Sequence, residues 1–325
     1  MNILVAGGAG YIGSALLPQL VDRGYNIIVA DLLWFGNHLP PSIKVFQKDI
    51  FDLNEAELRG IDQVIFLGGL SNDPMAEFSP SMNFVFNAAA PAYLAYLAKV
   101  AGVRRFIYAG SCSVYGYTVN ELYDENSPAI SKHPYGISKL QGEKAVMQMA
   151  DEKFSVICFR QGTVSGYSPR MRLDLIVNTM FKSAMEKGEI TINNPSIWRP
   201  ILSIDDACSA YIRAVESSEE ISGIFNVASG NYTVGECGDI VRFVLESRLN
   251  KKIRLNIKHI QDYRNYKVSI EHAQNVLSFK PRHDVASITE NLIANNDKFS
   301  DYGNPLYYNI RVFESMKTRI QVLER

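Results

Sequence analysis

The chain has little cysteine, no excess of charge of one sign and no long hydrophobic run. Its 4 Cys are scattered among 325 residues, without the CxxC pairs of a zinc site or the density of a disulfide scaffold. We therefore expect a reducing, cytoplasmic environment and no metal site. The formal net charge of −1 provides no global field for nucleic acid. Because no targeting segment and no apolar span of about 18 residues is found, we expect no membrane association either.

What the chain does have is ample core material, with 47% hydrophobic residues, in an alternation of apolar runs and helix-like stretches. Continuous apolar runs are typical of parallel strands that are covered on both faces. The sequence therefore predicts an α/β protein with a doubly wound parallel sheet. The expected strands are Asn2–Ala6, Asn26–Ala30, Lys44–Phe46, Gln63–Leu67, Arg105–Ala109 and Ser155–Arg160.

Beyond the alternating region the pattern becomes irregular, which suggests a second, smaller unit. We expect a cofactor domain over residues 1–165, with a returning segment at about 199–227, and a substrate lobe over 166–325. Helices are predicted at Arg170–Gly188 and Val234–Arg248 in this lobe. Two earlier helices, Met82–Ala101 and Tyr135–Ala150, have apolar faces broader than one sheet contact requires. Either core packing or a second subunit covers the surplus, and the second case makes a homodimer.

A glycine-rich turn, Gly7–Gly13 (GGAGYIG), follows the first strand and precedes a helix. Missing side chains let backbone amides approach a pyrophosphate, and the helix N-terminus favours its negative charge. Such a turn also occurs for steric reasons alone. Here, however, the next strand ends at Asp31, at the distance where an acid binds the adenosine ribose. An acid there repels a 2′-phosphate, so the sequence favours NAD over NADP.

A second constellation consists of Ser111, after a strand, and the helical pair Tyr135 and Lys139. The pair lies one turn apart on one helix face. An ammonium beside a phenol lowers the pKa of the phenol, so we predict that Tyr135 is the general base for a substrate hydroxyl. Ser111 would hydrogen-bond the same oxygen. The spacing of Tyr and Lys alone is weak evidence, and the order of all these motifs is what makes it specific.

With these motifs the chain resembles the extended short-chain dehydrogenase/reductase family, specifically its nucleotide-sugar epimerases, dehydratases and reductases. The resemblance extends to Asp49-Ile50, RPILSIDD at Arg199–Asp206 and FNVASG from Phe225. It implies a Rossmann-type NAD domain and a C-terminal lobe that carries a nucleotide sugar, with hydride transfer at C4 through a 4-keto species. The implied catalytic residues are Ser111, Tyr135 and Lys139.

The resemblance also implies two sets of binding residues. Contacts to NAD are expected from Gly7, Gly10, Tyr11, Ile12, Gly13, Asp31, Asp49, Ile50, Leu67 and Lys139. Contacts to the sugar nucleotide are expected from Asn178, Arg199, Arg264 and Arg172. Arginine suits this task because its planar fork pairs with phosphate oxygens in a bidentate way. The alternative for Arg199 is a surface arginine without a ligand. Arg170 and Arg172 either line the nucleotide pocket or face solvent beside Asp174 and Glu186.

Departures from the family pattern narrow the reaction. The dehydratases carry a side-chain acid after the position of Ser111, whereas this chain has Cys112 and Ser113, so a dehydratase is disfavoured. Thr163 stands at a position where many members of this family carry Asn. The reactions left open are epimerisation, 4-keto-sugar reduction and ping-pong 4-dehydrogenation, as in enzymes similar to GDP-heptose 4-dehydrogenases. A small hydroxy- or amino-acid dehydrogenase and a non-catalytic NAD-binding protein are the alternatives from other classes.

Overall fold

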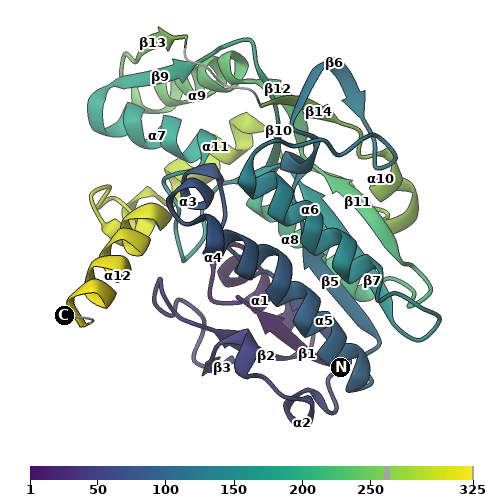
Figure 1. Cartoon of the computed structure of the whole chain (residues 1–325). Coiled ribbons are helices and arrows are strands. Elements are labelled where there is room, and N and C mark those ends of the chain that lie inside the picture. Colours follow the sequence, from purple (N-terminus) through teal and green to yellow (C-terminus); the bar gives the residue numbers. More distant parts are fainter. Residues whose placement is uncertain (260–263, 324–325) are drawn as a thin grey trace.

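A computed structural model of the chain describes residues 1–259 and 264–323 (Figure 1). Its central element is a seven-stranded parallel sheet in the order β11-β7-β5-β4-β1-β2-β3. The strand order reverses between β1 and β4, which creates a crevice at their carboxyl ends. The strands are β1 (Asn2–Ala6), β2 (Asn26–Asp31), β3 (Lys44–Gln47), β4 (Gln63–Phe66), β5 (Arg105–Ala109), β7 (Ser155–Gln161) and β11 (Gly223–Val227). The predicted α/β doubly wound parallel sheet is confirmed.

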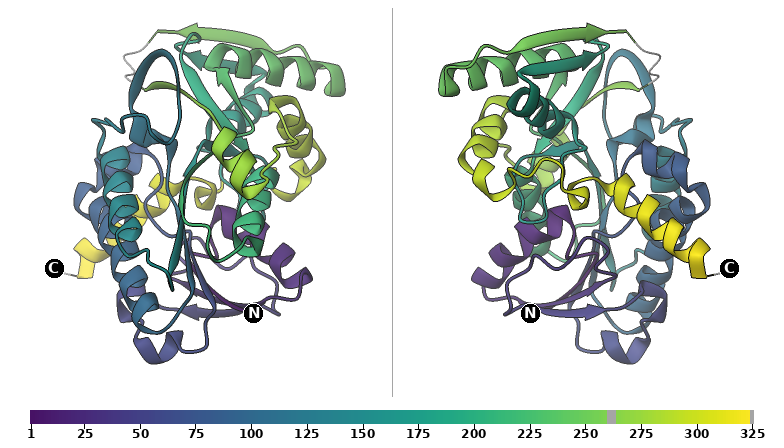
Figure 2. Two further views of the ribbon diagram at one scale, coloured as in Figure 1. Left: turned by 90° about the vertical axis from the view of Figure 1, so that its right-hand side faces the viewer. Right: turned by 90° about the vertical axis from the view of Figure 1, so that its left-hand side faces the viewer.

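Helices cover both faces of the sheet (Figure 2), as the continuous apolar strands require. Alternate residues of β1 show this directly, because Ile3 and Val5 join the core on one face and Leu4 and Ala6 join the core on the other. The first face carries α1 (Tyr11–Asp22), α8 (Ile204–Glu216) and α10 (Glu271–Leu277). The second carries α2 (Glu55–Leu58), α5 (Ala90–Val100) and α6 (Pro134–Met147).

A smaller group of elements lies beyond the carboxyl ends of the strands, around its own apolar core. Its helices are α7 (Ile176–Lys187), α9 (Val234–Leu249) and α11 (Val285–Ala294). One small sheet joins β8 (Thr163–Ser165), β10 (Trp198–Ser203) and β12 (Gly230–Thr233), and the parallel pairs are β9 (Glu189–Asn193) with β13 (Arg254–Lys258) and β6 (Tyr117–Tyr123) with β14 (Asn265–Val268). The domain boundaries near residues 165 and 199–227 stay a prediction.

The chain ends in α12 (Asn309–Leu323), which packs beside α3 (Asp73–Phe78) and α4 (Pro80–Phe84). The remaining short turns are Ile50–Asp52, Cys112–Tyr115, Asn296–Lys298 and Pro305–Tyr307. Within the described ranges, no helix is both long and apolar enough to cross a membrane.

Two predicted helices differ from the observed ones. The helix expected over Met82–Ala101 is interrupted by a π-turn at Val85–Ala89, between α4 and α5. Pro91 lacks an N–H for the carbonyl one turn earlier, at Asn87, and that carbonyl instead accepts the Tyr108 hydroxyl at 3.0 Å. The helix expected from Arg170 begins only at Ile176, because Arg170 and Arg172 are held in polar contacts with other segments.

Candidate active site

A pocket of about 560 Å³ opens at the carboxyl ends of β1, β4, β5 and β7, between the sheet and the smaller group of elements. Ligands of doubly wound sheets bind at this switch point. The pocket collects most of the predicted residues in one place, namely Gly7, Gly10, Tyr11, Ile12, Leu67, Ser111, Tyr135, Lys139, Arg172, Arg199 and Arg264.

The glycine turn is shaped so that side chains cannot enter it. Gly7 has φ of +74°, and a Cβ there would lie 2.5 Å from Gly68. A Cβ on Gly13 would lie 2.0 Å from the Gly8 carbonyl oxygen, so helix α1 can approach the turn only with glycine at this position. Gly10 caps α1 without any side-chain hydrogen bond. Backbone N–H groups at this helix start therefore suit the pyrophosphate of a dinucleotide.

Asp31 lies at the end of β2 and is tied to the same turn. Its carboxylate accepts the Ala9 N–H at 2.9 Å and the Leu33 N–H at 2.7 Å. Burial raises the pKa of this carboxyl, and the two backbone donors act in the opposite direction. Asp31, Asp49 and Ile50 line one hollow of about 110 Å³ beside the glycine turn. These residues fit the adenosine half of the cofactor, as the sequence predicts.

Tyr135 and Ser111 line the pocket where β5 ends and α6 begins. Tyr135 lies in the first turn of α6, and Ser111 directly follows β5. Burial raises the pKa of Tyr135 to about 12, the hydrogen bond from Ser111 lowers it, and the Asp73 carboxylate raises it. Tyr135 and Ser111 thus lie in one part of the pocket, where one substrate oxygen would contact both.

Lys139 lies one turn beyond Tyr135 in the same pocket. Its Nζ donates to the Ala109 carbonyl at 2.9 Å and lies 5.2 Å from the Tyr108 ring centre. Burial lowers the pKa of this amine to about 7. Desolvation is the largest influence on the pKa of both groups, and the lowering of the Tyr135 pKa by the lysine ammonium stays a prediction.

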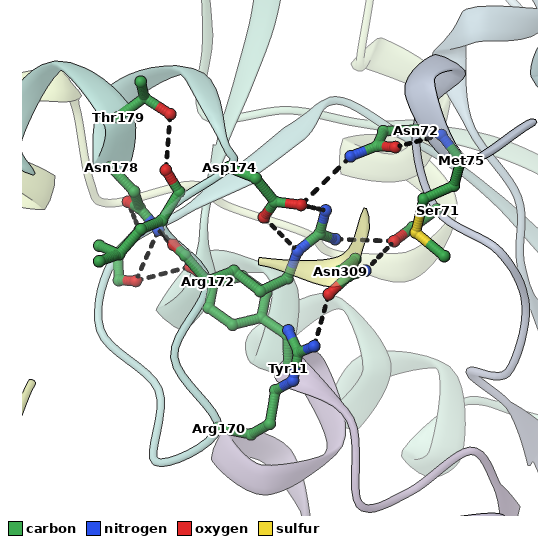
Figure 3. Close-up of polar contacts among 12 residues, drawn as sticks. Tyr11, Ser71, Asn72, Met75, Arg170, Arg172, Asp174, Asn178, Thr179 and Asn309 are labelled. Atoms are coloured by element: carbon green, nitrogen blue, oxygen red, sulfur yellow. Dashed lines mark hydrogen bonds and ion pairs between the residues drawn. The ribbon is translucent and has the colours of Figure 1, made fainter. Parts of the chain in front are cut away.

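The three predicted substrate arginines line the opposite part of the pocket. Arg264 pairs with the Asp73 carboxylate at 2.7 Å. Arg199 donates to the backbone carbonyls of Arg264 and Trp198. Arg172 contacts both oxygens of Asp174, at 2.9 and 3.0 Å, and also donates to Ser71 (Figure 3). Arg199 and Arg172 are both buried, so the alternative that they are surface arginines is wrong.

Asn178 occupies a different position from the one expected. Its side chain is fully buried and does not line the pocket. The amide donates to the Tyr11 hydroxyl at 3.2 Å and to the Arg172 carbonyl at 2.8 Å, and accepts the Gly166 N–H at 2.9 Å (Figure 3). Asn178 therefore holds pocket residues in place, and the geometry does not support the predicted direct contact with the substrate.

Two residues at the pocket were not named as site residues from the sequence. Asn87 of the π-turn donates to the Leu70 carbonyl at 2.9 Å and lies beside Lys139. Asp73 lines the pocket and pairs with Arg264, and no signal in the chain itself distinguished it from an ordinary loop residue. Arg170, for which the sequence left a pocket position and a solvent-facing position open, lines the pocket.

A buried ion pair anchors the helix that carries Tyr135 and Lys139. Arg160, at the end of β7, makes two contacts with Glu143 of α6, at 2.7 and 2.9 Å. The same guanidinium donates to the Tyr115 hydroxyl at 2.8 Å. Because both charged side chains are almost completely buried, the pair fixes α6 against the sheet.

The sequence of the chain is similar to those of known enzymes. A family model, described as the NAD dependent epimerase/dehydratase family, matches residues 3–228. The chain is 27% identical over 256 residues to a UDP-glucose 4-epimerase of Lactobacillus helveticus, covering 71% of this chain and 77% of that protein. It is 24% identical over 293 residues to a putative UDP-glucose 4-epimerase of Methanocaldococcus jannaschii, covering 87% and 94%.

Solved structures show the same architecture. MoeE5 in complex with UDP-glucuronic acid and NAD has a TM-score of 0.81 at 23% identity, covering 92% of this chain and 99% of that chain. A UDP-glucuronic acid 4-epimerase of Bacillus cereus, in complex with UDP-glucuronic acid and NAD, has a TM-score of 0.77 at 22% identity, covering 89% and 97%. At these identities the likeness establishes the fold.

Proposed function

The chain belongs to the NAD-dependent epimerase/dehydratase family, and from that premise we propose that it oxidises a nucleotide sugar at C4 through a 4-keto species. The observation that supports this most strongly is that Ser111, Tyr135 and Lys139 line the same pocket as the glycine turn. A pocket that only stores a dinucleotide has no need of a proton-transfer group.

The far part of the pocket supports a sugar nucleotide as the substrate. Arg172, Arg199 and Arg264 line one cavity in a chain whose formal net charge is only −1, so positive charge is concentrated there. Guanidinium groups bind a diphosphate through charge-assisted hydrogen bonds. A small hydroxy or amino acid needs neither this cluster nor a cavity of about 560 Å³.

In the mechanism, NAD when bound supplies the hydride acceptor next to the sugar ring. Tyr135 takes the proton from the substrate hydroxyl, and Ser111 donates a hydrogen bond to the same oxygen as it becomes a carbonyl. Lys139 would hold the nicotinamide ribose and Asp31 the adenosine ribose, and their positions in the two hollows support these roles. If the hydride returns to the other face of the ketone, the product is an epimer. If the ketone is released instead, the enzyme is a dehydrogenase.

Elimination of water is not supported by the residues after Ser111. The Cys112 thiol is buried and donates to the Arg160 carbonyl at 3.1 Å. Burial raises its pKa, so it is no acid–base partner at neutral pH. A 4-keto-sugar reductase and a ping-pong 4-dehydrogenase use the same residues and remain the second candidates.

We also propose that the protein is a homodimer in the cytoplasm. Tyr96 and Val100 lie one turn apart on α5 and are both more than half exposed, and Val85 is exposed nearby. Apolar side chains of this size on one helix face favour contact with a second copy. Sedimentation velocity of the purified protein measures the mass of the assembly, and a monomer at micromolar concentration would contradict this assignment.

The proposed function is tested by mass spectrometry of the small molecules released when the freshly purified protein is denatured, followed by titration of the protein with NAD and NADP. Retained NAD favours an epimerase or a ping-pong dehydrogenase, and NAD that binds only on titration favours a dehydrogenase or reductase with exchangeable cofactor. Selective binding of NADP, or of neither dinucleotide, would contradict the proposal.

A further inference from the structure

Arg170 differs from the other arginines of the pocket. Arg172 and Arg264 each pair with a carboxylate, whereas Arg170 forms no salt bridge within residues 1–259 and 264–323. The residue is only 2% exposed, and its Nε has no hydrogen-bond partner among the described residues. Burial lowers the pKa of the guanidinium to about 9, which still leaves it charged at neutral pH. Asp31 and Asp174 act on this guanidinium only from beyond ion-pair distance, so among the described residues it has no carboxylate in contact and is suited to hold an anion.

The position of Arg170 indicates which anion this is. The side chain lines the pocket together with Gly7, Gly10 and Tyr11, at the start of α1. Figure 3 shows Arg170 close to Tyr11. The backbone of Arg170 is held next to α1, because its N–H donates to the Ser14 hydroxyl at 3.2 Å. Its guanidinium also lies 3.8 Å from the ring centre of Phe35, in the segment that follows Asp31. Arg170 therefore faces the part of the pocket between the glycine turn and the predicted ribose site.

We propose that Arg170 is the side-chain ligand of the cofactor pyrophosphate, and that Asn309 of the C-terminal segment positions it. This inference rests on the proposed function, since it requires a dinucleotide in the pocket. The helix N-terminus supplies backbone donors to one side of the diphosphate, and the guanidinium supplies charge from the other. The diphosphate of the sugar nucleotide has its own arginines, Arg199 and Arg264.

Asn309 connects Arg170 to the C-terminal helix. Its Oδ1 accepts from Arg170 Nη2 at 2.5 Å, and its Nδ2 donates to Ser71 at 2.9 Å (Figure 3). One turn later in α12, Phe313 is buried and packs edge-on against Trp34, with ring centres 5.0 Å apart. The start of α12 thus joins the loops that follow β2 and β4 to the segment of Arg170. Asn309 is a positioning residue, because it acts on the cofactor through Arg170.

The test compares ligands that do and do not carry the cofactor diphosphate. Dissociation constants of NAD, ADP-ribose, adenosine and UDP are measured by calorimetry for the wild type and Arg170→Met. We expect roughly 10- to 100-fold weaker binding of NAD and ADP-ribose, because a charge-assisted contact is lost. Binding of adenosine and UDP should be unchanged. Arg311→Met, which changes an exposed arginine of α12, is the matched control and should bind all four ligands like the wild type.

A second pair of variants separates charge from folding. Arg170→Gln keeps a donor for Asn309 while removing the charge, and its loss of NAD affinity should match that of Arg170→Met. Asn309→Ala should weaken NAD by a smaller factor, roughly 3- to 10-fold. Wild-type NAD affinity in both Arg170 variants would overturn the inference, as would a loss confined to UDP. If the wild type itself binds neither NAD nor ADP-ribose, the proposed function fails and this inference fails with it.

Discussion

The change of Tyr135 to Phe removes one oxygen and leaves the rest of the site intact. The ring stays half-buried in the first turn of α6, and the Ser111 Oγ keeps its hydrogen bond from the Ser113 N–H at 3.2 Å. We therefore expect unfolding free energy to change by no more than about 1 kcal/mol and NAD to bind as before. Turnover should fall by roughly 10²- to 10⁴-fold, the usual contribution of a positioned general base. That factor corresponds to about 3–5 kcal/mol in the barrier.

The assay is single-turnover formation of the reduced nicotinamide, followed by absorbance after mixing NAD-loaded protein with the nucleotide sugar. Tyr211→Phe is the control, because this tyrosine is buried, does not line the pocket and has no partner for its hydroxyl among the described residues. It should react at the wild-type rate. A Tyr135→Phe protein that reacts as fast as the wild type would refute the assignment of the base.

Further predictions concern the charges around the site. Lys139→Met should stabilise the protein, measured without added cofactor, by up to about 4 kcal/mol near pH 7. The reason is that the native amine, with a pKa of about 7, loses its charge at a pH where the unfolded amine keeps it; the gain should therefore vanish as the pH rises towards 10.5. Thermal unfolding measured against pH tests this. Glu143→Gln should lower the free energy of unfolding by roughly 3–5 kcal/mol in urea titrations, because Arg160 is left buried without its partner, and Glu143→Leu with Arg160→Met should restore most of it. Asp31→Asn should reduce the ratio of NAD to NADP affinity at least about 10-fold, as the charge that repels a 2′-phosphate is lost; an unchanged ratio would contradict the role of this acid.

The parts of the structure that depend on local sterics and pattern were predictable from the chain. Buried strands such as Arg105–Ala109 carry a continuous apolar pattern that only a covered parallel sheet accommodates. Gly7 and Gly13 are required by contacts within a few residues and one neighbouring loop, so the turn could be identified from the sequence. The order of Ser111, Tyr135 and Lys139 was informative because β5 and α6 bring them to one edge.

The features that were missed depend on contacts between distant segments. Arg170 lies in a stretch with helical character, but its contact with Asn309 keeps that stretch out of α7. Asn178 was assigned to the substrate, whereas its neighbours in the fold, Tyr11 and Gly166, use all of its hydrogen-bonding capacity together with Arg172. Burial raises the pKa of Tyr135, and this effect cannot be read from residue spacing.

The central claim is that this pocket transfers hydride between a nucleotide sugar and NAD. The most direct measurement mixes the NAD-bound protein with a panel of UDP-, dTDP- and GDP-sugars and records the reduced nicotinamide together with the mass and stereochemistry of each sugar. The account predicts that at least one sugar nucleotide is oxidised or epimerised at C4, and that Tyr135→Phe abolishes the signal. A protein that holds NAD but converts no member of the panel would contradict it.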